Sequence, residues 1–75
     1  MTLDKETIAK VLHANYDAAA KLLAKAAQDM ADAAAAAARG EINLAVGTTM
    51  GAEADTKKAL LLTEAASTIR QAGQA

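Results

Sequence analysis

The chain has 75 residues, no cysteine and a formal charge of −1, with eight Lys and Arg set against nine Asp and Glu. This composition excludes disulfides and thiolate metal sites, and the balanced charge disfavours nucleic acid or an anionic membrane as a partner. The sequence contains 23 alanines but only 17 large apolar residues, too few for a substantial core in so short a chain. We therefore expect a single domain, residues 1–75, whose core is completed by other copies of the chain.

The N-terminal segment, Met1 to Glu6, is interrupted by acidic residues and lacks the apolar stretch of a secretion signal. The longest unbroken apolar run, residues 33–38, is far shorter than the ~20 residues of a membrane-spanning helix. We expect a soluble cytoplasmic protein without a membrane span.

A first long helix is predicted over about residues 3–38. Thr2 is the expected N-cap, and Asp4 and Glu6 would lie near the positive end of the helix dipole. The alanine track 31–38 is followed by Arg39 and Gly40, a cation near the negative helix end and a glycine able to adopt the left-handed conformation. This pair predicts the helix stop and a turn.

Within this helix, apolar residues recur at alternating steps of three and four, the spacing of a coiled-coil seam. Its large members alternate with alanines, and the seam comprises Ala9, Leu12, Tyr16, Ala19, Leu23, Ala26, Met30, Ala33 and Ala37. Most charged residues fall outside it. The main conflict is Asp29, which lies beside a second strip formed by Ile8, Asn15, Leu22 and Ala36.

A second helix is predicted over about residues 41–72. One stripe of apolar residues has a period closer to 11/3 than to 7/2 residues per turn. It comprises Ile42, Val46, Met50, Ala54, Leu61, Ala65 and Ala72. A second seam lies beside it, made of Ala45, Ala52, Ala59, Leu62, Ala66 and Ile69.

Two glycines leave two interpretations of residues 47–51. The segment is either a loop, or part of a continuous helix in which Gly47 and Gly51 allow close approach of another helix. The apolar stripe keeps helical phase across the first glycine, which favours the continuous helix.

Together these elements predict an all-α, antiparallel two-helix hairpin, with helices of ~54 and ~48 Å at 1.5 Å per residue. The hairpin should be most closely packed near its alanine-rich turn. It would complete its core by homo-oligomerisation into a helical bundle or a larger assembly. The predicted oligomer interface comprises Leu12, Tyr16, Ala19, Leu23, Ala26, Met30, Leu61, Leu62, Ala65 and Ile69.

Few residues suggest a ligand site. His13 and Asp17 share a helix face at a spacing that can hold a metal, but an ordinary interface histidine explains the pattern better. Tyr16 is the sole aromatic residue and is expected to pack in the core. A metal or haem site built from His13 and Tyr16 across subunits is the weakest of the functional hypotheses.

Nucleic-acid binding and catalysis are also poorly supported. Lys10, Lys21 and Lys25 lie near one outer line of the first helix, but Asp17 interrupts them, so a solvated face is expected. No carboxylates have the spacing of a catalytic pair, and Gly47-x-x-x-Gly51 lacks the lysine of a phosphate-binding loop. We expect no catalytic, cofactor-binding or metal-binding residue.

Two functional hypotheses follow. The first is a non-enzymatic, self-assembling structural or scaffolding protein that has itself as partner. The alternative is a small dimeric adaptor or regulator that binds protein or RNA through the outer face of a four-helix bundle. A discrete dimer or tetramer would favour the adaptor, and a large ring, shell or filament would favour the structural role.

Overall fold

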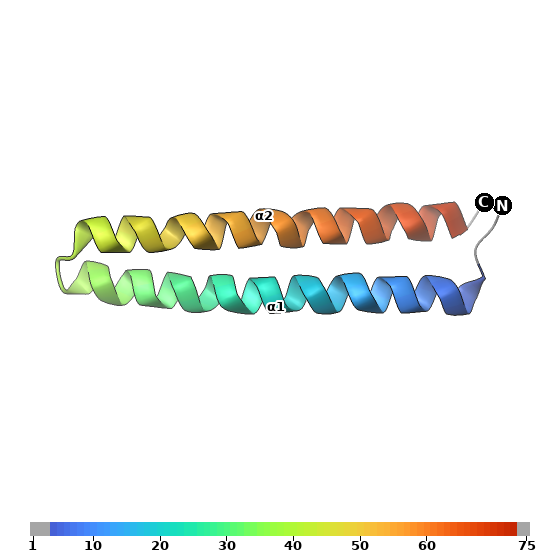
Figure 1. Ribbon diagram of the computed structural model, residues 1–75, viewed down its shortest axis with the longest axis horizontal. Coiled ribbons are helices and arrows are strands. Elements are labelled where there is room, and N and C mark those ends of the chain that lie inside the picture. The colour runs from blue at the N-terminus through green and yellow to red at the C-terminus, as the bar shows by residue number, and fades with distance from the viewer. Residues whose placement is uncertain (1–3, 74–75) are drawn as a thin grey trace.

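The computed structural model describes residues 4–73, which form two α-helices, α1 (Lys5–Ala38) and α2 (Ile42–Gly73). The helices lie side by side and antiparallel along their whole length, joined by a short turn (Figure 1). The resulting rod has Cα extents of 56 × 14 × 10 Å. The predicted all-α antiparallel hairpin is confirmed. Neither described helix combines the length and apolarity needed to cross a membrane.

The start of α1 differs from the prediction. Asp4 is the N-cap: its carboxylate accepts hydrogen bonds from the backbone N–H of Thr7, at 2.8 Å, and from the Thr7 hydroxyl, at 3.0 Å. The helix therefore begins at Lys5 rather than at residue 3, because the side chain of Asp4 occupies the capping position. Thr2, the predicted cap, lies outside the described residues.

The turn forms where the sequence predicts it. Gly40 has φ +81°, a conformation that favours glycine because it has no Cβ. Its N–H bonds to the Ala37 carbonyl, at 3.0 Å, and the N–H of Glu41 bonds to the Ala36 carbonyl, at 2.9 Å. This pair of bonds is the Schellman motif, which satisfies carbonyls at the end of α1. An ion pair between Arg39 and Glu41 spans the same turn.

Helix α2 continues unbroken through Gly47 and Gly51, so the continuous helix is confirmed and the alternative loop is wrong. The two threonines between these glycines have hydroxyls bonded to their own helix. Thr48 donates to the Leu44 carbonyl, at 2.8 Å, and Thr49 to the Val46 carbonyl, at 2.7 Å. These polar groups are therefore satisfied without interrupting the backbone hydrogen bonding.

The core between the helices is made only of alanines. On α1 and α2 the buried side chains are those of Ala19, Ala26, Ala33, Ala36, Ala45, Ala52, Ala59 and Ala66. Most recur every seven residues, so each helix presents one line of methyl groups to the other. In α2 this contact uses the seam that begins at Ala45, while Ile42, Val46 and Met50 of the other stripe are exposed.

The contact made by α1 keeps the alanine half of the main predicted seam, but residues one position earlier in the sequence replace its large half. Its alanine half packs against α2, but Asn15, Leu22 and Asp29 of the neighbouring strip occupy the half-buried positions beside it. Tyr16, Leu23 and Met30, the large half of the predicted seam, do not face into the hairpin and are exposed. A cross-helix polar cluster accommodates Asp29 at this contact, because Lys25 lies between its carboxylate and that of Asp55.

Candidate functional site

Large apolar side chains are poorly covered by the hairpin. Nine are exposed by between 48% and 71% of their area: Tyr16, Leu23, Met30, Ile42, Leu44, Val46, Met50, Leu60 and Leu61. The other large apolar residues within residues 4–73 are half-buried: Ile8, Val11, Leu12, Leu22, Leu62 and Ile69. Exposed apolar surface on this scale points to a binding partner, because soluble monomers rarely leave extended apolar patches uncovered.

One part of this surface follows a straight line along α1. Tyr16, Leu23 and Met30 lie seven residues apart, and each is 48% exposed, which places all three at the same angle beside the hairpin seam. Ala9 and Ala37 extend the line by seven residues in each direction. The line therefore runs along most of the length of α1.

Threonines of α2 form the other half of this face. Thr49, Thr56 and Thr63 also lie seven residues apart. Thr49 lines a shallow groove together with Met30, so the two lines are on the same side of the hairpin. With the helices antiparallel, the same spacing sets Thr56 across from Leu23 and Thr63 across from Tyr16. We call these six residues the apolar face.

The threonine hydroxyls do not make this face polar. Thr49, Thr56 and Thr63 donate to backbone carbonyls of their own helix, at 2.7, 2.7 and 3.0 Å. Their hydrogen-bonding capacity is therefore largely used within α2. Sequence reasoning missed these threonines, although their seven-residue spacing was a signal that could have found them.

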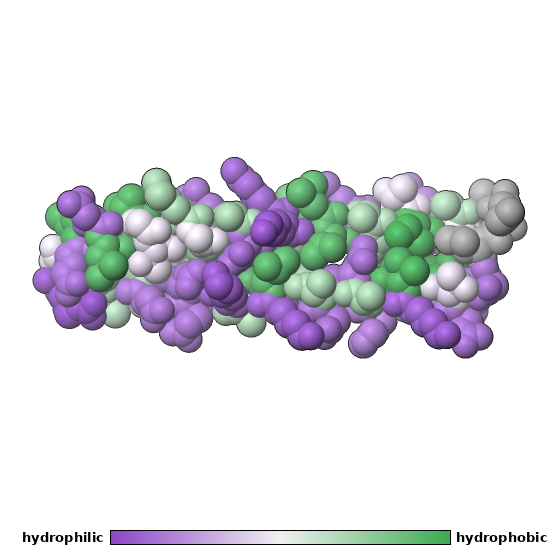
Figure 2. Space-filling model, viewed as in Figure 1, coloured by the Kyte–Doolittle hydropathy of each residue, from purple (hydrophilic) through white to green (hydrophobic). Residues whose placement is uncertain are grey.

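The rest of the surface is more mixed. Figure 2 shows apolar patches alternating with hydrophilic ones on one face, and hydrophilic atoms along most of the outer edge of α1. A second shallow groove is lined by Leu22, Lys58, Leu61 and Leu62, so it combines apolar side chains with a cation.

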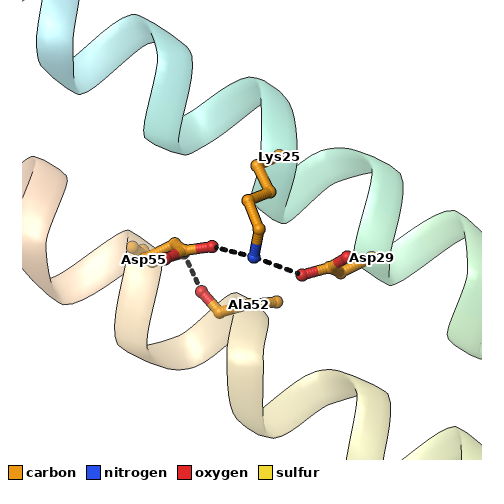
Figure 3. Close-up of polar contacts among 5 residues, drawn as sticks. Lys25, Asp29, Ala52 and Asp55 are labelled. Atoms are coloured by element: carbon orange, nitrogen blue, oxygen red, sulfur yellow. Dashed lines mark hydrogen bonds and ion pairs between the residues drawn. The ribbon is translucent and has the colours of Figure 1, made fainter.

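A polar cluster interrupts the alanine core at mid-length. Lys25 of α1 extends between two carboxylates, Asp29 on its own helix and Asp55 on α2 (Figure 3). Its Nζ lies 2.9 Å from Asp55 Oδ2 and 3.5 Å from Asp29 Oδ2. The hydrogen bond to Asp55, with the charge of Asp29, raises the pKa of Lys25. The shared ammonium is what allows two carboxylates to lie at the helix contact.

A second polar contact joins the helices nearer the open end of the hairpin. The Asn15 side-chain amide donates to the Leu62 carbonyl, at 3.1 Å. The sequence places Asn15 in the strip beside the predicted seam, but no pattern marks Asp55 as a contact residue. Asp29, the charge that breaks the apolar pattern, is the sequence signal for the charged cluster.

The residues predicted for an oligomer interface fall into two groups. Ala19 and Ala26 are buried inside the hairpin, and Leu12, Leu62 and Ile69 are half-buried. The remaining five are exposed and free to contact another molecule: Tyr16, Leu23, Met30, Leu61 and Ala65. Their role in an oligomer stays a prediction.

The two glycines predicted at a close helix approach have different surroundings. A Cβ at Gly47 would have no other atom within 4 Å, so α1 does not approach it, and a close approach there would need a second molecule. A Cβ at Gly51 would lie 3.5 Å from Asp29 Oδ2, an ordinary contact.

Two outer lysines of α1, Lys10 and Lys21, are paired with carboxylates. Lys10 Nζ lies 3.6 Å from Glu6 Oε1, and Lys21 Nζ lies 2.9 Å from Asp17 Oδ2. The bond from Lys21 lowers the pKa of Asp17. Asp17 is thus engaged by Lys21, and the exposed His13 belongs to no cluster of three potential metal-binding side chains within residues 4–73.

No protein-family model, curated protein or solved structure matches the chain.

Proposed function

We propose that this hairpin is a non-enzymatic self-assembly module, a structural or scaffolding subunit that associates with other copies through its apolar face. The observation that carries the proposal is the line of Tyr16, Leu23 and Met30, half-exposed along one side of a rod whose own core contains only alanine.

The energetics favour association. Alanines remove little apolar area from water, whereas complete burial of a Leu or Met side chain contributes about 1.5–3 kcal/mol. Covering the exposed half of Tyr16, Leu23 and Met30 would contribute roughly 1 kcal/mol for each residue in each copy. Several such contacts are comparable with the stability of a small domain, so association and folding are expected to be coupled.

The charges of α1 favour this function over an RNA-binding adaptor. Three lysines of α1 each pair with a carboxylate: Lys10 with Glu6, Lys21 with Asp17 and Lys25 with Asp55. Nucleic-acid binding depends on cations that are free to replace the counterions of phosphates. An outer face with internally neutralised lysines is better suited to solubility than to RNA binding.

The test is the effect of one charge on assembly. Leu23→Asp would place a carboxylate in the apolar face and should reduce the solution mass to that of the 7.6 kDa monomer, with much of the helicity lost. Ala24→Asp introduces the same side chain one residue away, at an exposed position off this line, and should keep the assembly. An unchanged mass for Leu23→Asp would contradict the proposal. Electron microscopy then separates a discrete oligomer from the ring, shell or filament of a structural role.

A further inference from the structure

The apolar face has a symmetric pattern. Along α1 its line reads Ala9, Tyr16, Leu23, Met30 and Ala37, which is small, large, large, large, small, centred on Leu23. The line on α2 reads threonine three times, centred on Thr56, the residue across from Leu23. The next positions on the α2 line, seven residues before Thr49 and after Thr63, are Ile42 and Arg70, so on α2 the symmetry about this layer covers the three threonines.

We propose that the apolar face binds a second copy related by a two-fold axis through the Leu23 and Thr56 layer, so that the two turns lie at opposite ends. This inference rests on the self-association proposed above and specifies its geometry. Leu23 meets the partner's Leu23, and Tyr16 meets the partner's Met30. An interface around a two-fold axis must be complementary to itself, and a pattern symmetric about the axis meets that requirement.

The size of the face suits a second copy. With Cα extents of 56 and 14 Å in the plane of the helices, the whole side of the hairpin that carries this face has a projected area of about 800 Å², close to the area that each partner buries in a standard protein interface. None of the six residues of the apolar face is charged, and Ala20, Ala27 and Ala34 form a further line of small residues beside the α1 line. On α2 the line beside the threonines begins at Val46 and carries one charge, Glu53. When two copies meet, none of the six residues brings a charge that has to be desolvated.

The alternative arrangement places both turns at the same end. It would set α1 over the partner's α2, with Leu23 against the partner's Thr56. In the two-fold arrangement proposed here, each large apolar residue is instead covered by another large apolar residue, which removes more apolar area from water. The two arrangements bring different pairs of residues together and are distinguished by cross-linking.

The experiment uses single cysteines, because the chain has none of its own. Leu23→Cys should form a covalent dimer of about 15 kDa, twice 7.6 kDa, under mild oxidation or with a short bismaleimide. Ala24→Cys, the matched control off the apolar face, should form little covalent dimer. Tyr16→Cys and Met30→Cys should cross-link efficiently with each other when mixed but weakly when separate. Circular dichroism confirms that each variant keeps its helicity.

Three results would overturn the two-fold arrangement, self-association or both. A dimer or larger oligomer in which neither Leu23→Cys nor the mixed pair cross-links would overturn the two-fold arrangement and leave self-association standing. Efficient cross-linking of Leu23→Cys with Thr56→Cys, but not with itself, would show that the turns lie at the same end. A monomeric mass for the unmodified chain would overturn both proposals.

Discussion

Lys25 on α1 donates a hydrogen bond to Asp55 on α2 at 2.9 Å, and this contact lies at mid-length in a core otherwise lined by alanines. Asp55 is only 13% exposed, and Asp29 adds a second carboxylate at 3.5 Å from the same ammonium. Alanine lines can slide past each other by one heptad with little loss of contact. A charge cluster that forms only in one alignment is therefore expected to specify the register of the hairpin.

Removing the shared cation should destabilise the hairpin. In Lys25→Met, Asp29 and Asp55 would face each other across the helix contact without compensation, so the Tm measured by circular dichroism should fall. Lys21→Met is the control, because its partner Asp17 is an exposed residue of the same helix, and its effect should be small. Adding Asp55→Leu to Lys25→Met should recover stability. Equal effects of the two lysine substitutions would contradict a register-setting role.

Stability should decline on both sides of a neutral plateau. The pKa of Lys25 is raised by its bond to Asp55. The contribution of Lys25 to stability is therefore complete below the ordinary lysine range, about pH 10, and is lost as the pH rises through the raised pKa. The pKa values of Asp4 and Asp17 are lowered, by bonds from Thr7 and Lys21 respectively. Their contributions are present above about pH 4 and are lost as the pH falls through the lowered values.

The measurement for this pH dependence is the Tm at fixed protein concentration across the range. Asp17→Asn should reduce the loss on the acidic side, and Lys25→Met should reduce the loss on the alkaline side. A Tm that rises as the pH falls below about 4 would contradict these assignments.

The alanine core should not tolerate a larger side chain. Ala52 is 0% exposed, so Ala52→Leu would force the helices apart and destabilise the hairpin by about 1–3 kcal/mol or more. Ala54→Leu adds the same atoms to an exposed position of α2 and should change the free energy of unfolding by within about 0.5 kcal/mol. Urea titrations of both variants provide the comparison. A neutral Ala52→Leu would mean that the helices are not in close contact there.

Replacing glycine by alanine should destabilise the hairpin at the turn and stabilise it within α2. Gly40→Ala places a Cβ at φ +81° and should cost about 1–2 kcal/mol. Gly47→Ala should stabilise the helix by about 1 kcal/mol, because no other atom lies within 4 Å of the added Cβ. Thermal unfolding measures both. A destabilising Gly47→Ala would instead indicate that another copy approaches the backbone of α2 at this glycine.

The hairpin itself could be predicted from local signals. Gly40 after a long alanine track indicates a helix stop, and the helical phase from Ile42 to Met50 indicates a continuous second helix. The N-cap cannot be assigned from the sequence alone, because Thr2 and Asp4 are both good capping residues.

The side of α1 that faces α2 could not be predicted from apolar spacing alone. Tyr16, Leu23 and Met30 form a more apolar strip than Asn15, Leu22 and Asp29 do, so the pattern favoured the first strip for the core. The second strip is accommodated because Leu62 supplies a carbonyl to Asn15 and because Lys25 neutralises Asp29 beside Asp55. These contacts depend on how α1 and α2 pair and on where the Lys25 side chain lies. The apolar periodicity of a single helix contains neither piece of information.

In the proposed assembly, the hairpin covers its apolar face with further copies of itself. Sedimentation equilibrium of the unmodified chain at micromolar concentration tests this most directly. We expect a mass that is a multiple of 7.6 kDa, at least that of a dimer, and dissociation only together with loss of helicity. A stable, fully helical species of 7.6 kDa at that concentration would contradict it.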